Sequence, residues 1–93
     1  MAYARVATFD DVPQEALDEI TREINEGERP EGLPATEVIV LVDRERGRME
    51  AITFFDSEED YRQGDQTLRA MNPPSGMGSA AIDKYEVVVR RSD

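Results

Sequence analysis

The sequence predicts one α+β domain, residues 1–93, with the element order β-α-β-β-α-β and a four-stranded antiparallel sheet. Three observations lead to this prediction. Four segments have the apolar pattern of strands, and two have apolar residues at helical spacing. Turn and capping residues separate all six segments. With 93 residues, the chain is also too short for a second domain of ordinary size.

The first two elements are predicted from the N-terminal third of the chain. Tyr3–Phe9 alternates and is rich in strand formers. Asp10 and Pro13 then begin a helix, because Asp suits the N-cap and Pro fits the first turn. Gly27 is a suitable C-cap residue, and Glu28–Pro34 is expected to be a loop. The helix has one apolar face, formed by Ala16, Leu17, Ile20 and Ile24.

A hairpin is predicted next. Ala35–Val42 forms one strand, and its run of apolar residues indicates burial on both faces. Asp43–Gly47 is a polar turn with Gly near its end. Arg48–Phe55 then forms the third strand, so these two strands are neighbours in the sheet.

The last two elements follow the same logic. Ser57–Asp60 resembles a capping box, with Asp in place of Glu or Gln at its third position. Asn72–Pro74 ends the second helix, and Ser75–Ala81 is expected to be a loop. The last strand is predicted over Lys84–Arg91, centred on Val87–Val89. The helix has apolar or small residues at helical spacing: Tyr61, Gly64, Leu68 and Met71.

This order predicts the ferredoxin-like arrangement. Two right-handed crossovers around a central hairpin place both helices on one face of the sheet. If Asp43 and Arg48 flank the hairpin turn, the register pairs Val42 with Met49, Val40 with Ala51 and Val38 with Thr53. This uncharged set is expected to lie beneath the helices. An apolar cavity or ordinary core packing accounts equally well for a set of candidate pocket residues: Met49, Ala51, Thr53, Phe55, Leu68 and Met71.

The opposite face of the sheet, here called the open face, predicts a homodimer. It mixes apolar and charged side chains and is too apolar to remain in water. The same face of a second subunit is the simplest cover, and about 800 Å² per partner makes an interface of standard size. An Arg5–Glu50 pair is expected there, and a monomer with a semi-polar face remains the alternative. The predicted dimer face consists of Arg5, Ile39, Leu41, Glu50, Ile52 and Phe54.

Composition excludes several function classes. The chain has no Cys, His or Trp, so it cannot form a disulfide, a zinc site of Cys and His, or a Ser-His-Asp triad. A net charge of −10 opposes binding to nucleic acid. No apolar run approaches the roughly 20 residues of a membrane span, and nothing resembles a signal peptide. We therefore expect a cytoplasmic protein that binds no metal or cofactor.

Three segments resemble the dimeric α/β-barrel superfamily, in particular its antibiotic-biosynthesis-monooxygenase-like branch. They are Tyr3–Phe9, Leu41–Gly47 and Ile52–Asp60, and the terminal Tyr85–Val87 fits as well. The resemblance covers nearly the whole chain. It implies two ferredoxin-like sheets packed face to face, in agreement with the dimer expected from the open face.

The resemblance also implies a function. Members oxidise polyketide-like aromatics without metal or flavin, or degrade haem, in a pocket between sheet and helices. Their pocket commonly presents Asn and Trp four residues apart on the third strand, where this chain has Ala51 and Phe55. The His of the haem-degrading members is also missing, whereas a Tyr in the first turn of the second helix is retained as Tyr61.

Two functions therefore remain open. In the first, the chain binds or oxidises a small apolar or aromatic molecule in a helix–sheet pocket, and Tyr61 is the candidate catalytic residue. The phenol of Tyr61 would orient the ligand or act as an acid, although an amphipathic Tyr that only packs its ring is the simpler interpretation. In the second, the chain is a non-catalytic binding or assembly module with a filled core.

The RNA-recognition domain shares the topology, but Met49 and Ala51 stand where its stacking aromatics belong.

Overall fold

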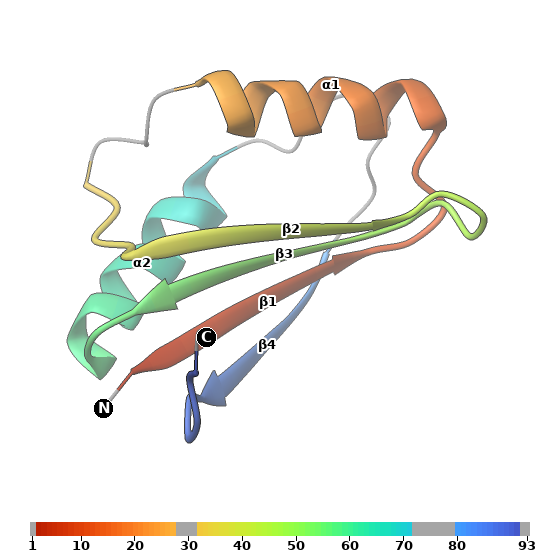
Figure 1. Ribbon diagram of the computed structural model, residues 1–93. Coiled ribbons are helices and arrows are strands. Elements are labelled where there is room, and N and C mark those ends of the chain that lie inside the picture. Colours follow the sequence, from red (N-terminus) through yellow and green to blue (C-terminus); the bar gives the residue numbers. More distant parts are fainter. Residues whose placement is uncertain (1, 28–31, 72–79, 92–93) are drawn as a thin grey trace.

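The computed structural model describes residues 2–27, 32–71 and 80–91, and these form one sheet and two helices (Figure 1). The elements alternate along the chain in the predicted order. Their bounds are β1 Tyr3–Phe9, α1 Gln14–Glu26, β2 Glu37–Asp43, β3 Arg48–Phe55, α2 Glu58–Ala70 and β4 Ala81–Glu86. The predicted loop Ser75–Ala81 lies largely outside the described residues, as does Asn72–Pro74.

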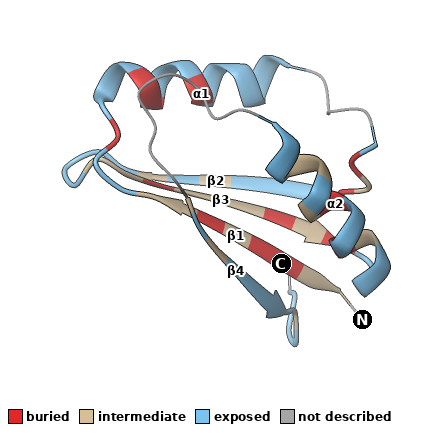
Figure 2. Ribbon diagram, turned by 180° about the vertical axis from the view of Figure 1, so that it is seen from behind, coloured by how far each residue is buried: buried red, intermediate tan, exposed pale blue. Residues whose placement is uncertain are grey.

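The sheet has the strand order β2-β3-β1-β4, with every neighbouring pair antiparallel. Both helices lie on the same side of it (Figures 1 and 2). This arrangement confirms the predicted ferredoxin-like fold. No helix in the described part of the chain has the length and apolar character needed to cross a membrane.

The hairpin register confirms the assignment of the two faces of β2 and β3. Val38 pairs with Thr53, Val40 with Ala51 and Val42 with Met49. Gly47 closes the turn with a φ of 65°, in the left-handed region that favours glycine. The backbone N–H of Val12 donates to the carbonyl oxygen of Gly47 at 2.7 Å, which fixes the turn to the start of α1.

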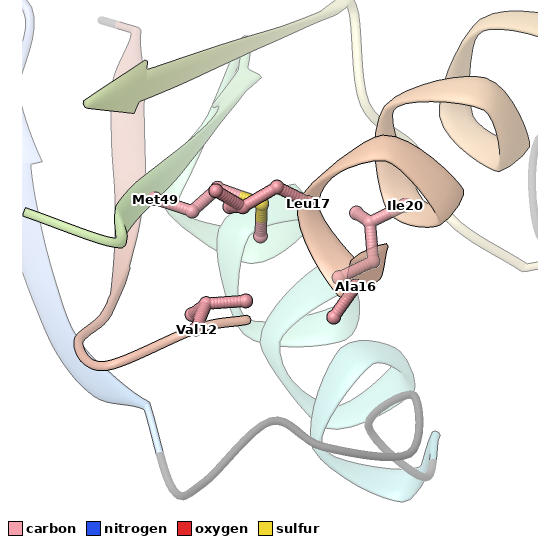
Figure 3. Packing of buried hydrophobic residues seen from close by; sticks show 5 residues of the cluster. All are labelled: Val12, Ala16, Leu17, Ile20 and Met49. Carbon is pink, nitrogen blue, oxygen red and sulfur yellow. The ribbon is translucent and has the colours of Figure 1, made fainter. Parts of the chain in front are cut away.

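Among the described residues, most of the buried hydrophobic side chains fall into two clusters. The first joins α1 to the turn end of β3, where Leu17 and Met49 lie side by side (Figure 3). The second joins α2 to the other end of β3, with the fully buried Phe55 at its centre. Their buried members are Val12, Ala16, Leu17, Ile20 and Met49 in the first, and Leu33, Ala35, Phe55 and Tyr61 in the second.

The two helix starts differ. Ser57 caps α2 as predicted, and its hydroxyl accepts a hydrogen bond from the N–H of Asp60 at 3.1 Å. The predicted Asp10 cap of α1 is wrong, because α1 begins at Gln14 with Pro13 at its N-cap and no side-chain cap. The ring of Pro13 fixes φ near the helical value, which favours the start of the helix without a capping hydrogen bond from a side chain.

Two strand predictions need correction. β2 is not buried on both faces, since it is an edge strand and Val38, Ile39 and Leu41 are exposed within one chain. The last strand is β4 at Ala81–Glu86, earlier than Lys84–Arg91. β4 pairs only with β1, and Glu86 lies opposite Tyr3, the first residue of that strand. The chain beyond Glu86 therefore has no strand to pair with.

Gly64→Ala tests the contact between α2 and β3. A Cβ at position 64 would overlap the ring of Phe55. We expect overpacking to cost about 1–3 kcal/mol, against about 1 kcal/mol gained in helix propensity. Urea unfolding should show net destabilisation, reduced in the Gly64→Ala/Phe55→Leu double variant relative to the sum of the singles. Stabilisation by about 1 kcal/mol, as at an exposed helical glycine, would contradict this packing.

Candidate functional site

Tyr61, the candidate catalytic residue, is packed among aromatic rings in the first turn of α2. Its ring makes edge contacts with Phe55 and Tyr3, at centroid distances of 5.6 Å and 6.5 Å. Leu33 and Ala35 belong to the same buried cluster. The described residues thus fill the space around the Tyr61 ring, where a ligand pocket was one of the two predicted alternatives.

Two groups of ion-paired side chains lie close to Tyr61. The Nε of Arg5 donates to Asp65 Oδ1 at 2.9 Å, and Arg69 binds the same carboxylate. On the other side, Lys84 Nζ lies 5.0 Å from the Tyr61 ring centroid and 3.2 Å from a Glu58 carboxylate oxygen. These pairs join α2 to the adjacent strands β1 and β4.

The placement of Arg5 corrects a prediction. Arg5 lies opposite Thr53 on the helix face of β1 and is only 6% exposed. Glu50 lies opposite Thr8 on the other face, so the expected Arg5–Glu50 pair does not form. Arg5 lies two residues after Tyr3 on β1, so both residues are on the face of the strand beneath α2. Asp65 supplies the carboxylate that allows the charge of Arg5 to be buried.

Burial and the neighbouring charges shift three pKa values. Burial raises the pKa of Tyr61 and the nearby Asp65 charge adds to this, so its phenol is kept protonated. Burial also opposes the ionisation of Asp65, but hydrogen bonds from Arg5 and Arg69 outweigh it and hold the pKa of Asp65 below 3.8. The hydrogen bond from Lys84 lowers the pKa of Glu58.

The six predicted pocket residues do not gather around one cavity. Met49 belongs to the α1 cluster, whereas Phe55 lies in the α2 cluster with Leu68 packed against it. Thr53 is buried and Ala51 half-buried between the two clusters, and Met71 is exposed at the end of α2.

A cleft that was not predicted lies between the C-terminal half of α1 and β2. Its volume is about 200 Å³. Across it, Ile24 from the apolar side of α1 is 45% exposed and Val38 from the helix face of β2 is 44% exposed. The lining residues are Thr21, Ile24, Asn25, Val38 and Val40. The signal in the sequence was Ile24, which extends the apolar stripe of α1 one turn beyond Ile20.

The remaining members of the predicted dimer face do lie together on the open face. Register places Ile39 beside Ile52, and Leu41 beside Glu50. Ile39 and Leu41 are exposed, whereas Ile52 and Phe54 are half-buried. A shallow hollow of about 210 Å³ near the hairpin turn is lined by Leu41, Val42, Asp43, Arg46, Arg48 and Glu50. Within residues 2–27, 32–71 and 80–91, no group of acidic side chains is placed to hold a metal ion.

Asp65→Asn tests the buried Arg5 pair. Loss of the carboxylate leaves the Arg5 charge buried, and we expect a cost of about 2–3 kcal/mol at pH 7, less than for a fully buried pair because the Asp65 side chain is 23% exposed. Since the folded-state pKa of Asp65 lies below its ordinary value, its stabilising effect is complete above about pH 4 and is lost as the pH falls further.

The measurement is urea unfolding of both proteins from pH 7 to pH 3. The difference in unfolding free energy should shrink only at the acid end. Glu59→Gln, which changes an exposed carboxylate on the same helix, serves as the control and should be nearly neutral. A pH-independent difference would show that the charge of Asp65 does not stabilise the fold.

The fold is similar to solved structures whose names concern haem degradation or oxidation. A variant of MhuD with two manganese protoporphyrin IX bound per active site has a TM-score of 0.70 and 13% identity, covering 98% of this chain and 99% of that chain. MhuD from Mycobacterium tuberculosis, a haem degrader with two haems in its active site, has a TM-score of 0.65 and 15% identity, covering 97% and 99%.

A third similar structure is described as an antibiotic biosynthesis monooxygenase from Chloroflexus aurantiacus. Its TM-score is 0.65 with 11% identity, covering 99% of this chain and 98% of that chain. No family model and no curated protein matches the sequence. At these identities the similarity shows the fold alone. The chain therefore has the ferredoxin-like fold of antibiotic-biosynthesis-monooxygenase-like proteins, as the resemblance of its sequence predicts.

Proposed function

We propose that this protein binds a small, mostly apolar molecule in the cleft between α1 and β2. The observation that carries the proposal is the incomplete packing of this helix–sheet interface. Ile24 and Val38 belong to the faces that should bury each other, yet both remain nearly half exposed beside a space of about 200 Å³. Covering them is favourable by about 25 cal/mol per Å² of apolar surface removed from water.

The lining of the cleft indicates the class of ligand. Three of its five side chains are aliphatic. The Thr21 hydroxyl donates to the carbonyl of Leu17, so Asn25 offers the amide that can both donate and accept a hydrogen bond with a ligand. The volume is below the roughly 300–1,000 Å³ of typical ligand pockets. A one- or two-ring molecule with a single polar group fits this description, whereas a porphyrin is too large.

Binding is favoured over oxidation as the function. MhuD, which has a similar fold, holds haem in its active site, and this supports a small-molecule role. This chain, however, has no His to ligate haem iron. The phenol of Tyr61 is packed in the α2 cluster and does not line the cleft. The packed region around Tyr61 also favours the second candidate, an assembly module whose core near α2 is filled by its own side chains.

Calorimetric titration with indole, 2-naphthol and camphor tests the binding proposal. Wild-type protein should bind at least one of them. Val38→Phe should abolish binding, because the larger ring fills the cleft, whereas Val38→Ala should keep it. Circular dichroism would confirm that both variants fold. Failure of all three probes to bind, or equal binding by Val38→Phe, would contradict the proposal.

We also propose that the protein is a homodimer through the open face. The exposed Ile39 and Leu41 adjoin half-buried Ile52 and Phe54, and together they form an apolar strip on two neighbouring strands. An apolar strip of this kind is normally covered, and a two-fold copy of the same face is self-complementary.

Light scattering at micromolar concentration tests the dimer. The mass should be about twice 10.5 kDa. Ile52→Asp should reduce it to that of a monomer, because a carboxylate would be buried in an apolar interface. Gln66→Asp adds the same charge to an exposed position of α2 and should leave the dimer intact. A wild-type protein that runs as a monomer would refute this part of the proposal.

A further inference from the structure

The segment Val87–Arg91 leaves the sheet and turns back across it. The N–H of Val87 donates to the carbonyl oxygen of Ala2 at 2.9 Å, one residue beyond the β1–β4 pairing that ends at Tyr3 and Glu86. Strand β1 begins at Tyr3, so Val88 and Val89 have no neighbouring strand.

Arg90 anchors this segment to the open face. Its guanidinium lies over the ring of Phe54, with the central carbon 4.7 Å from the ring centroid, and it forms an ion pair with Glu37. Glu37 and Phe54 lie opposite each other on β2 and β3, and Phe54 faces Ala4 on β1. The segment therefore runs from β4, at one edge of the sheet, to β2 at the other.

The two side chains just before this anchor are apolar and almost uncovered. Val88 is 79% and Val89 75% exposed, more than any other large hydrophobic side chain among the described residues. A segment that only covered its own sheet would turn its valines inward and its arginine outward. Here the arginine contacts the sheet and the valines do not pack on it.

We propose that Val88 and Val89 are contact residues for a second copy of this chain, held on the open face by Arg90. The inference rests on the proposed dimer and identifies a part of its interface that lies outside the strands. Because Arg90 holds the segment on the open face, a second sheet approaching that face would meet these exposed valines as well as the exposed Ile39 and Leu41. The Arg90 charge is already neutralised by Glu37, so the partner is required to cover only apolar surface.

Sedimentation velocity of the full chain over a dilution series tests this inference. Val88→Ser/Val89→Ser should raise the dimer dissociation constant about tenfold or more, since one covered valine side chain corresponds to roughly that factor. Arg90→Glu should also weaken the dimer, because it places a negative charge beside Glu37 and releases the anchor. Met71→Ser removes an exposed apolar side chain at the end of α2, on the other side of the sheet, and should leave the dimer dissociation constant unchanged.

The outcomes separate this inference from the proposed dimer. A wild-type dimer weakened by both C-terminal variants, but not by Met71→Ser, supports it. A wild-type dimer whose dissociation constant is unchanged in the double serine variant overturns the inference and leaves the dimer standing. A tighter dimer also overturns it, because the segment would then cover its own face in competition with the partner. A monomeric wild-type protein overturns both.

Discussion

Two short helices must cover one face of a four-stranded sheet, and each packs on a different end of β3. Helix α1 lies over Met49, and α2 lies over Phe55. Between Met49 and Phe55, Ala51 on β3 lies opposite Ala7 on β1. These small side chains give neither helix a large residue to pack against. The cleft beside Val38 is a consequence of this spacing. The second face of the sheet is left uncovered because both helices lie on the first.

The sequence was sufficient to predict the fold and the hairpin register, because both depend on local patterns. Alternation in β1, the polar turn after β2 and the Ser57 cap each specify their own element. Gly64 lies on the buried stripe of α2, where the absence of a side chain lets the helix approach the ring of Phe55 on β3. These features require no knowledge of contacts between distant residues.

The site was predicted less well, because it depends on such contacts. Arg5 was predicted to lie in the dimer face with Glu50, because its actual partner, Asp65 on α2, comes sixty residues later in the chain. The cleft was missed because alternation identifies the helix face of β2 but not how far α1 extends over it. Val87–Val89 has strand-forming composition but does not form a strand, since β1 begins at Tyr3, opposite Glu86, and has no residues to pair with the chain beyond. Sequence patterns describe single segments, whereas these three features depend on where a neighbouring segment begins or ends.

The central claim is that the split between the two core clusters leaves a ligand cleft at α1 and β2, away from Tyr61. Nuclear Overhauser effects between a bound two-ring probe and the methyl groups of isotope-labelled protein test it most directly. The account predicts contacts from the probe to Ile24, Val38 and Val40, with none to Leu68 or the Tyr61 ring. Contacts to Leu68 and Tyr61 instead would place the ligand within the α2 cluster and contradict the account.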